Sequence, residues 1–317
     1  MRRGPTRDYA ARMTYSIVAR DPETGRFGVA VQSHYLSVGP VVPWLEAGVG
    51  AVATQASVNV SFGPIALEML RAGWEAERIV AALVAGDPGA AQRQLGVVDA
   101  EGRAAAHTGA ECILACGHRV GEGYTVQGNL LANDEVWSSM APAFETARAA
   151  GLPFWEQLMR ALEAAEAAGG DVRGRQSAAM QIVDAAPVGG PWRGRHLDLR
   201  VEDHADPIPE LRRILTIDRA YALLDEAGDE ARAGRSEEER YADARSLAPD
   251  AIELVFWTAL QHAEAGRTEE ARREMRVAFD APDGANWRAT LEHLRDGGRV
   301  DRGIADTLLE TEGVDVS

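Results

Sequence analysis

The segment that decides the fold of the N-terminal part of this chain is residues 14–33, TYSIVARDPETGRFGVAVQS. Its two ends, YSIVAR (15–20) and FGVAVQS (27–33), are rich in β-branched and aromatic residues, which favour strands. Between them stands DPETG (21–25), where the proline and the glycine are typical of a tight turn. Residues 14–33 therefore predict a β-hairpin that opens the first domain.

Further strands and helices follow the hairpin in an order that indicates the fold class. Alternating or short apolar runs predict strands, and apolar residues every three to four positions predict helices. The predicted strands are AVATQA (51–56), LGVVDA (95–100), GRAAAHTG (102–109), YTVQGNLLA (124–132), SAAMQIVDA (177–185) and HLDLRVEDH (196–204). One helix is predicted over 63–84 and two over 134–168, interrupted at Gly151-Leu152-Pro153. This order favours an α+β fold with antiparallel sheets and is compatible with a four-layer αββα sandwich.

A change of composition after Pro207 marks a second domain. The residues that follow are mostly Glu, Arg, Ala and Leu, typical of an all-helical module. Residues 241–283 place apolar side chains at the spacing of a helix pair around Ala265-Gly266-Arg267, which resembles a tetratricopeptide unit; a generic helical hairpin is an equal alternative. The predicted division is a leader over 1–12, disordered or read from a start codon placed too far upstream, a first domain over 13–212 and a helical domain over 213–317.

The net charge of the chain argues against several kinds of partner. The sequence has 49 acidic against 33 basic side chains, a formal net charge of −16, whose field repels nucleic-acid phosphates and anionic membrane surfaces. No run approaches the roughly 18 apolar residues of a membrane span, and two cysteines are too few for a disulfide-stapled secreted scaffold. We therefore expect a cytoplasmic protein that binds neither nucleic acid nor membranes. The sequence leaves a homo-oligomer open.

The leading candidate for chemistry is Thr14, which follows Met13 at the start of the hairpin. A small residue after a start Met allows that Met to be removed, and the α-amine of Thr14 is then free. An α-amine with a pKa near ~8 acts as general base for the adjacent hydroxyl, so that one residue supplies both nucleophile and base. The alternative is that Thr14 is simply the first residue of a strand.

The sequence predicts no metal and no cofactor. His107, Cys112, Cys116 and His118 are residue types that zinc accepts, but their spacing matches no familiar zinc pattern. Alternate residues of an extended strand around His118 also point to opposite faces. No Gly-x-Ser-x-Gly elbow, P-loop, dinucleotide fingerprint or His-Glu-x-x-His motif is present, which excludes the enzymes that those motifs mark.

Six stretches of the sequence, in matching order, resemble a known bacterial family. They are residues 14–33, GVGAVATQA (48–56), QLGVVDAEGRAAAHTG (94–109), VQGNLLA (126–132), GRQSAAM (174–180) and DLRVEDHADPIPELRRIL (198–215). Together they resemble the family catalogued as domain of unknown function number 1028. The resemblance implies the αββα fold of N-terminal-nucleophile (Ntn) hydrolases, which cleave amide bonds with an N-terminal Thr, Ser or Cys.

The same resemblance implies a set of site residues. Thr14 matches the first residue of the family's opening strand. Ser16, on the same face, is the backup nucleophile, and its alternative is a polar residue on a half-buried strand. Proteasome-like relatives tune the terminal amine with a Lys, and this sequence has none near the site. On the corresponding strand stands Gln55, whose amide is predicted to orient the substrate or an oxyanion. Asp171 and Ser177 resemble the Asp and Ser that support the nucleophile; a turn residue and a strand-entry hydroxyl are their alternatives.

A further polar residue is indicated by its place at the end of a strand. Asn129 follows Gly128, which permits close backbone approach, so that Asn129 is an oxyanion-hole candidate and equally a turn residue. The expected function is amide hydrolysis, with a small-molecule or peptide amide as substrate. The alternative is a non-catalytic binding or scaffold protein whose C-terminal helices recruit a protein partner.

Overall fold

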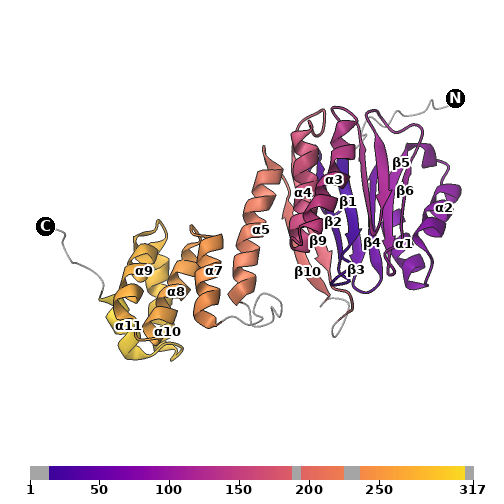
Figure 1. Ribbon diagram of the computed structural model, residues 1–317. Coiled ribbons are helices and arrows are strands. Elements are labelled where there is room, and N and C mark those ends of the chain that lie inside the picture. Colours follow the sequence, from indigo (N-terminus) through magenta and orange to yellow (C-terminus); the bar gives the residue numbers. More distant parts are fainter. Residues whose placement is uncertain (1–13, 188–193, 225–235, 311–317) are drawn as a thin grey trace, which may run out of the picture. The chain divides into compact units, whose positions relative to one another are not determined.

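The computed structural model describes residues 14–187, 194–224 and 236–310, and the leader predicted over 1–12 lies outside them. The chain divides into two compact units, residues 1–212 and 213–317. The first is a mixed α+β structure and the second is helical (Figure 1). The predicted α+β class and the helical C-terminal region are confirmed. No helix in the described part of the chain is long and apolar enough to cross a membrane.

Two antiparallel sheets form the centre of the first unit. The strands run in the order β10-β9-β2-β1-β8-β7 in the six-stranded sheet and β3-β4-β5-β6 in the four-stranded sheet. Their bounds are β1 (Thr14–Arg20), β2 (Phe27–Ser33), β3 (Pro43–Glu46), β4 (Gly50–Ala56), β5 (Arg93–Asp99), β6 (Ala104–Thr108), β7 (Gly117–Gly121), β8 (Tyr124–Asn129), β9 (Ser177–Val183) and β10 (Arg195–Val201). The short strand β3 has no counterpart among the strands predicted above.

The predicted hairpin is confirmed as the pair β1 and β2. Tyr15 pairs with Gln32, and the turn is closed by a hydrogen bond from the amide of Gly25, at φ +74°, to the carbonyl of Asp21. On its other side β1 pairs with β8, with Thr14 opposite Asn129. Thr14 therefore lies at the end of the six-stranded sheet where β1 begins and its neighbours β2 and β8 both end. This end is called the Thr14 edge.

Helices cover the outer faces of both sheets (Figure 1). Contacts join α1 (Phe62–Arg71) and α2 (Ala76–Gly86) to the four-stranded sheet, and α3 (Glu135–Ala149) and α4 (Phe154–Ala167) to the six-stranded sheet. The two helices predicted over 134–168 are confirmed. The single helix predicted over 63–84 is wrong, because Gly73 adopts φ +80° and the amide of Trp74 returns to the carbonyl of Met69, which ends the first helix.

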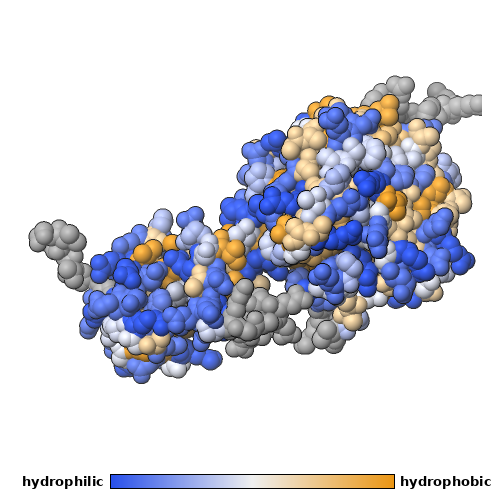
Figure 2. Space-filling view, in the orientation of Figure 1, coloured by the Kyte–Doolittle hydropathy of each residue, from blue (hydrophilic) through white to orange (hydrophobic). Residues whose placement is uncertain are grey.

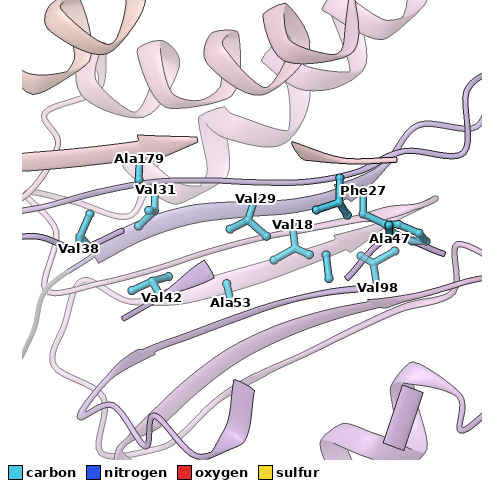
Figure 3. Packing of buried hydrophobic residues seen from close by; sticks show 12 residues of the cluster. Val18, Phe27, Val29, Val31, Val38, Val42, Ala47, Ala53, Val98 and Ala179 are labelled. Atoms are coloured by element: carbon cyan, nitrogen blue, oxygen red, sulfur yellow. The ribbon is translucent and has the colours of Figure 1, made fainter. Parts of the chain in front are cut away.

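Apolar side chains fill the space between the two sheets. Figure 3 shows valines of β1 and β2, among them Val18 and Val29, pointing toward Ala53 of β4 and Val98 of β5. These positions alternate along each strand, so every second residue of β1 and β2 faces the opposite sheet. A second cluster packs the helices α1 and α2 against the outer face of β4 and β5.

The second unit consists of helices that pack on one another. Helix α5 (Pro207–Leu224) runs across the division between the units, and after it come α7 (Glu237–Leu247), α8 (Ile252–Glu264), α9 (Thr268–Asp280), α10 (Gly284–Asp296) and α11 (Arg302–Leu309). The turn between α8 and α9 contains Gly266 at φ +78°, at the place where the sequence predicted a turn between paired helices. Phe256, Met275 and Leu291 lie in the apolar cluster of these helices.

Candidate functional site

The candidate site lies at the Thr14 edge, the end of the two sheets where β1 begins. Thr14 is 1% exposed, and its hydroxyl donates a hydrogen bond to the hydroxyl of Ser33, 3.3 Å away at the end of β2. The main-chain carbonyl of Thr14 accepts from the side-chain amides of Gln55, at 3.2 Å, and of Asn129, at 3.5 Å. The first residue of the hairpin is therefore held by three side chains on three strands.

Those two amides belong to a buried network between the sheets, which we call the amide network. It comprises Ser16, Gln55, Gln94, Gln127 and Asn129, none of them more than 3% exposed. The hydroxyl of Ser16 donates to Oε1 of Gln55 at 2.6 Å and accepts from Nε2 of Gln127 at 2.7 Å. Buried polar groups of this kind stabilise a fold only when they are paired, and these are.

Gln94 is the centre of the amide network. Its Oε1 accepts from both Gln55, at 2.8 Å, and Asn129, at 2.9 Å, and these are the two residues that donate to the Thr14 carbonyl. Its Nε2 lies 2.9 Å from Oγ1 of Thr108 and 2.8 Å from the carbonyl oxygen of Gly128. Gln94 thus fixes the orientation of both amides that hold Thr14.

The absence of a side chain at Gly96 leaves space for the amide network. A Cβ atom on Gly96 of β5 would lie 2.3 Å from Oγ1 of Thr125 and 2.5 Å from Oε1 of Gln127, too close for any side chain. Thr125 itself donates to Gln127 at 2.8 Å. The missing side chain at position 96 therefore lets the two sheets approach closely enough for their polar groups to bond.

A small pocket opens beside Thr14. Four valines line it, Val38, Val41, Val42 and Val58, together with the polar residues Thr14, Ser33, Tyr35 and Gln55. Its empty volume is about 200 Å³, part of which is open to solvent. The pocket therefore joins the candidate nucleophile to a mostly aliphatic surface.

Ser177 and Asp171 hold the segment that forms one wall of this pocket. The hydroxyl of Ser177 donates to the carbonyl of Tyr35 at 2.5 Å and accepts from the amide of Val38 at 3.1 Å. Oδ2 of Asp171 accepts from the amide of His34 at 3.0 Å and from Nη2 of Arg173 at 3.1 Å. Both residues therefore bind the segment that follows Ser33, and not Thr14 itself.

Backbone strain gathers at the same edge. Within the described ranges, the non-glycine residues with positive φ are Ser37 at 57°, Ala56 at 65° and Leu130 at 51°. Ser37 lies in the pocket wall segment, and Ala56 and Leu130 directly follow two members of the amide network, Gln55 and Asn129. Each such conformation costs about 1–3 kcal/mol, and they concentrate at functional sites. This clustering is one reason to treat the region around Thr14 as a candidate site.

The four zinc-type residues do not form a metal centre in this structure. His107 bonds the carbonyl of Ala90 at 2.9 Å, and His118 bonds Oγ1 of Thr108 at 2.8 Å. Burial raises the pKa of the Cys112 thiol to about 11, and burial together with the nearby His107 lowers the pKa of His118. Over the residues that the structure describes, no group of three or more His, Cys, Asp or Glu is placed to hold a metal ion.

The structure therefore brings the predicted residues together to different degrees. Gln55 and Asn129 contact Thr14 directly, while Ser16 lies inside the amide network and does not line the pocket. The amide nitrogens of Gln55 and Asn129 both donate to the carbonyl oxygen of Thr14 and to Oε1 of Gln94.

Three residues of the site have no counterpart in the sequence prediction. They are Ser33, Gln94 and Gln127. Ser33 could have been identified from the hairpin. Pairing YSIVAR with FGVAVQS places Ser33, the last residue of FGVAVQS, beside Thr14. For Gln127 the signal was the two-residue period that puts it on the same face as Asn129.

Comparison with known proteins supports one assignment. The model of the family of unknown function DUF1028 matches residues 14–211. The crystal structure of protein SPO2555 from Silicibacter pomeroyi, of the same family, is 33% identical and superimposes with a TM-score of 0.59, covering 69% of this chain and 94% of that one. No curated protein matches the chain. The match runs from β1 to the start of α5, and this protein belongs to the DUF1028 family.

Proposed function

We propose that the first unit is an Ntn-type amidohydrolase in which Thr14 is the nucleophile. The observation that carries the proposal is the place of Thr14: it is the first residue of a central strand, and its side chain lines the pocket. In this reading the two sheets and their outer helices form the αββα sandwich of the Ntn hydrolases. The substrate is a small-molecule or peptide amide.

The chemistry proposed for Thr14 needs no other ionisable side chain. The α-amine accepts the hydroxyl proton as the oxygen attacks the substrate carbonyl carbon. The C–N bond then breaks, the amine leaves with that proton, and a water molecule hydrolyses the ester on Thr14 to release the carboxylic acid. The Ser33 hydroxyl, 3.3 Å away, orients the Thr14 hydroxyl during these steps.

Two features of the site bear on which groups would stabilise the oxyanion and which group would act as the base. The amides of Gln55 and Asn129 hold the Thr14 carbonyl and bond Gln94, so main-chain N–H groups are the proposed oxyanion donors. The sequence contains no lysine at all, so no ammonium group tunes the α-amine. An unperturbed α-amine titrates near ~8, close to the range in which a general base works at neutral pH.

The absence of lysine makes the first experiment direct. The N-terminal α-amine is the one primary amine of the chain, wherever the mature chain begins. Intact mass of protein from its natural source, followed by acetylation with an amine-selective reagent and peptide mapping, identifies the residue that carries this amine. A single acetyl group on Thr14 supports the proposal, and an amine on any residue before Thr14 contradicts it.

Covalent labelling tests the nucleophile itself. A β-lactone probe should add to mature wild-type protein and to Thr14→Ser, and should not add to Thr14→Ala. Ser61→Ala is the matched control, because it removes an exposed hydroxyl that donates to Asn59 and does not line the pocket. Labelling that persists in Thr14→Ala removes Thr14 from the mechanism.

A binding or scaffold protein is the second candidate. The observation that favours it is the full use of the Gln55 and Asn129 amide donors inside the protein, together with the missing lysine. In that case the helices α8 and α9, as a tetratricopeptide-like pair, would recruit the protein partner. A mature N-terminus before Thr14 combined with no probe labelling would support this second function.

A further inference from the structure

We propose that the valine-lined pocket beside Thr14 is a specificity pocket that takes a small, uncharged aliphatic group of the substrate. The inference rests on the proposed function, since it assumes that Thr14 acts on the bound amide. It goes further by naming the substrate class: an amide whose acyl part carries a group between methyl and isopropyl in size.

The lining of the pocket excludes charged groups. None of its eight residues is an acid, an arginine or a histidine, and four of them are valines. A charged substrate group placed there would lose its hydration without gaining a counterion, which costs several kcal/mol. An apolar group would instead remove aliphatic surface from water.

The size of the pocket excludes large groups. The empty volume of about 200 Å³ includes space open to solvent, so the part that the walls enclose is smaller than this. The pocket therefore admits one small substituent, and the rest of the substrate lies outside it.

The pocket walls are held in place before any ligand arrives. The amides of Val41 and Val42 both donate to the carbonyl of Val38, and the amide of Val38 donates to Ser177. Next to Val58, the amide of Ser57 donates to the carbonyl of Gln92 at 3.1 Å. Because such walls do not yield without breaking these bonds, the pocket discriminates by size.

The surroundings of the pocket extend the same chemistry. The connections that meet at the Thr14 edge carry exposed aliphatic side chains: Leu36 after β2, Val60 after β4, and Leu114 between β6 and β7. Figure 2 shows hydrophobic residues at the upper end of the first unit and others farther down on the same, mixed face. An apolar substrate thus meets an apolar approach to the pocket.

The first test compares β-lactone probes that differ only in the substituent next to the carbonyl: methyl, isopropyl, benzyl and carboxymethyl. On mature full-length protein we expect methyl and isopropyl probes to label Thr14 roughly tenfold faster or more than the other two. Val58→Ala enlarges the pocket and should raise the relative rate of the benzyl probe. Val120→Ala is the matched control, because Val120 is 44% exposed on β7 and does not line the pocket.

The second test measures binding without chemistry. Methyl NMR of the full chain with labelled valines is followed during titration with isobutyramide, phenylacetamide or succinamate. We expect saturable shifts of the Val38, Val41, Val42 and Val58 methyl signals with isobutyramide and none with the other two. The Val120 methyl signals serve as the internal control.

The two tests separate the inference from the proposed function. Labelling of Thr14 with no preference among the probes overturns the specificity pocket and leaves the amidohydrolase standing. Selective binding of isobutyramide without labelling of Thr14 overturns the amidohydrolase and supports the pocket. The absence of both labelling and selective binding overturns both.

Discussion

The side-chain amide of Gln55 donates to the main-chain carbonyl of Thr14 across 3.2 Å, and so joins the first residue of one sheet to a strand of the other. This bond shows that the position of the candidate nucleophile is not set by its own sheet alone. It depends on the register between the sheets, on the amide network that fills the gap, and on the glycine that leaves room for it.

The centre of that network should carry a large share of the stability of the first unit. Gln94→Leu leaves the amides of Gln55 and Asn129 without their shared acceptor, and each buried group left unpaired costs about 1–3 kcal/mol. We expect the free energy of unfolding to fall by about 2–5 kcal/mol, measured from hydrogen exchange of the β1 amides. Gln92→Leu, the same change at an exposed position, should stay within about 0.5 kcal/mol. Equal effects of the two variants would contradict the central role of Gln94.

The close approach of the sheets should not tolerate a methyl group at position 96. Gly96→Ala places a Cβ 2.3 Å from Oγ1 of Thr125, so we expect a loss of about 1–3 kcal/mol and altered exchange in β5 and β8. Gly86→Ala is the control, since no atom lies within 4 Å of its Cβ and alanine favours the helix. A Gly96→Ala variant as stable as wild type would show that the sheets can separate freely.

Removal of the Ser177 hydroxyl should lower the local stability of the pocket wall segment around Val38. Ser177→Ala removes the acceptor of the Val38 amide and the donor to the Tyr35 carbonyl. We expect the Val38 amide to exchange at least about tenfold faster, in line with ~1.4 kcal/mol of lost local stability. Ser138→Ala, which removes an exposed hydroxyl bonded only within α3 and its N-terminal turn, should leave Val38 unchanged. An unchanged Val38 rate in Ser177→Ala would assign the anchoring to other contacts.

High pH should destabilise the first unit through a buried tyrosine. Burial, and then the hydrogen bond to Glu145, raise the pKa of Tyr124 from 10.0 to about 12. The folded state thus keeps a proton that the unfolded state has lost, so this stabilisation is complete below pH 10 and disappears as pH rises toward 12. The free energy of unfolding should fall over that interval, and less steeply in Tyr124→Phe. Phenolate absorbance shows whether Tyr124 ionises before or with unfolding; ionisation near pH 10 in the folded protein would disprove the shift.

Local patterns were enough to predict the elements on either side of the site. The hairpin of residues 14–33 and the helix pair around Gly151-Leu152-Pro153 are encoded by neighbouring residues, because turn chemistry and periodicity act over short distances. The break at Gly73 was missed for the opposite reason: apolar residues on both sides keep one helical period, and only the backbone conformation of one glycine separates them.

The site itself was only partly within reach of the sequence. Thr14 could be named as a candidate because it follows Met13, Gln55 because of the family resemblance, and Asn129 because it stands at a strand end. Their partner Gln94 could not, because it lies 39 residues from Gln55 and 35 from Asn129, and the pairing requires knowing which strands face each other across the core. The valine pocket was hidden in the same way, since Val38 and Val58 meet only after folding.

The amide network has a consequence for the life of the chain before it is fully folded. The carbonyl of Thr14 is held by residues 41 and 115 positions downstream, so its alignment requires synthesis and docking of most of the first unit. A chain still on the ribosome carries the candidate nucleophile but not the geometry that holds it. Under the proposed function, folding of the first unit therefore precedes any reaction at Thr14.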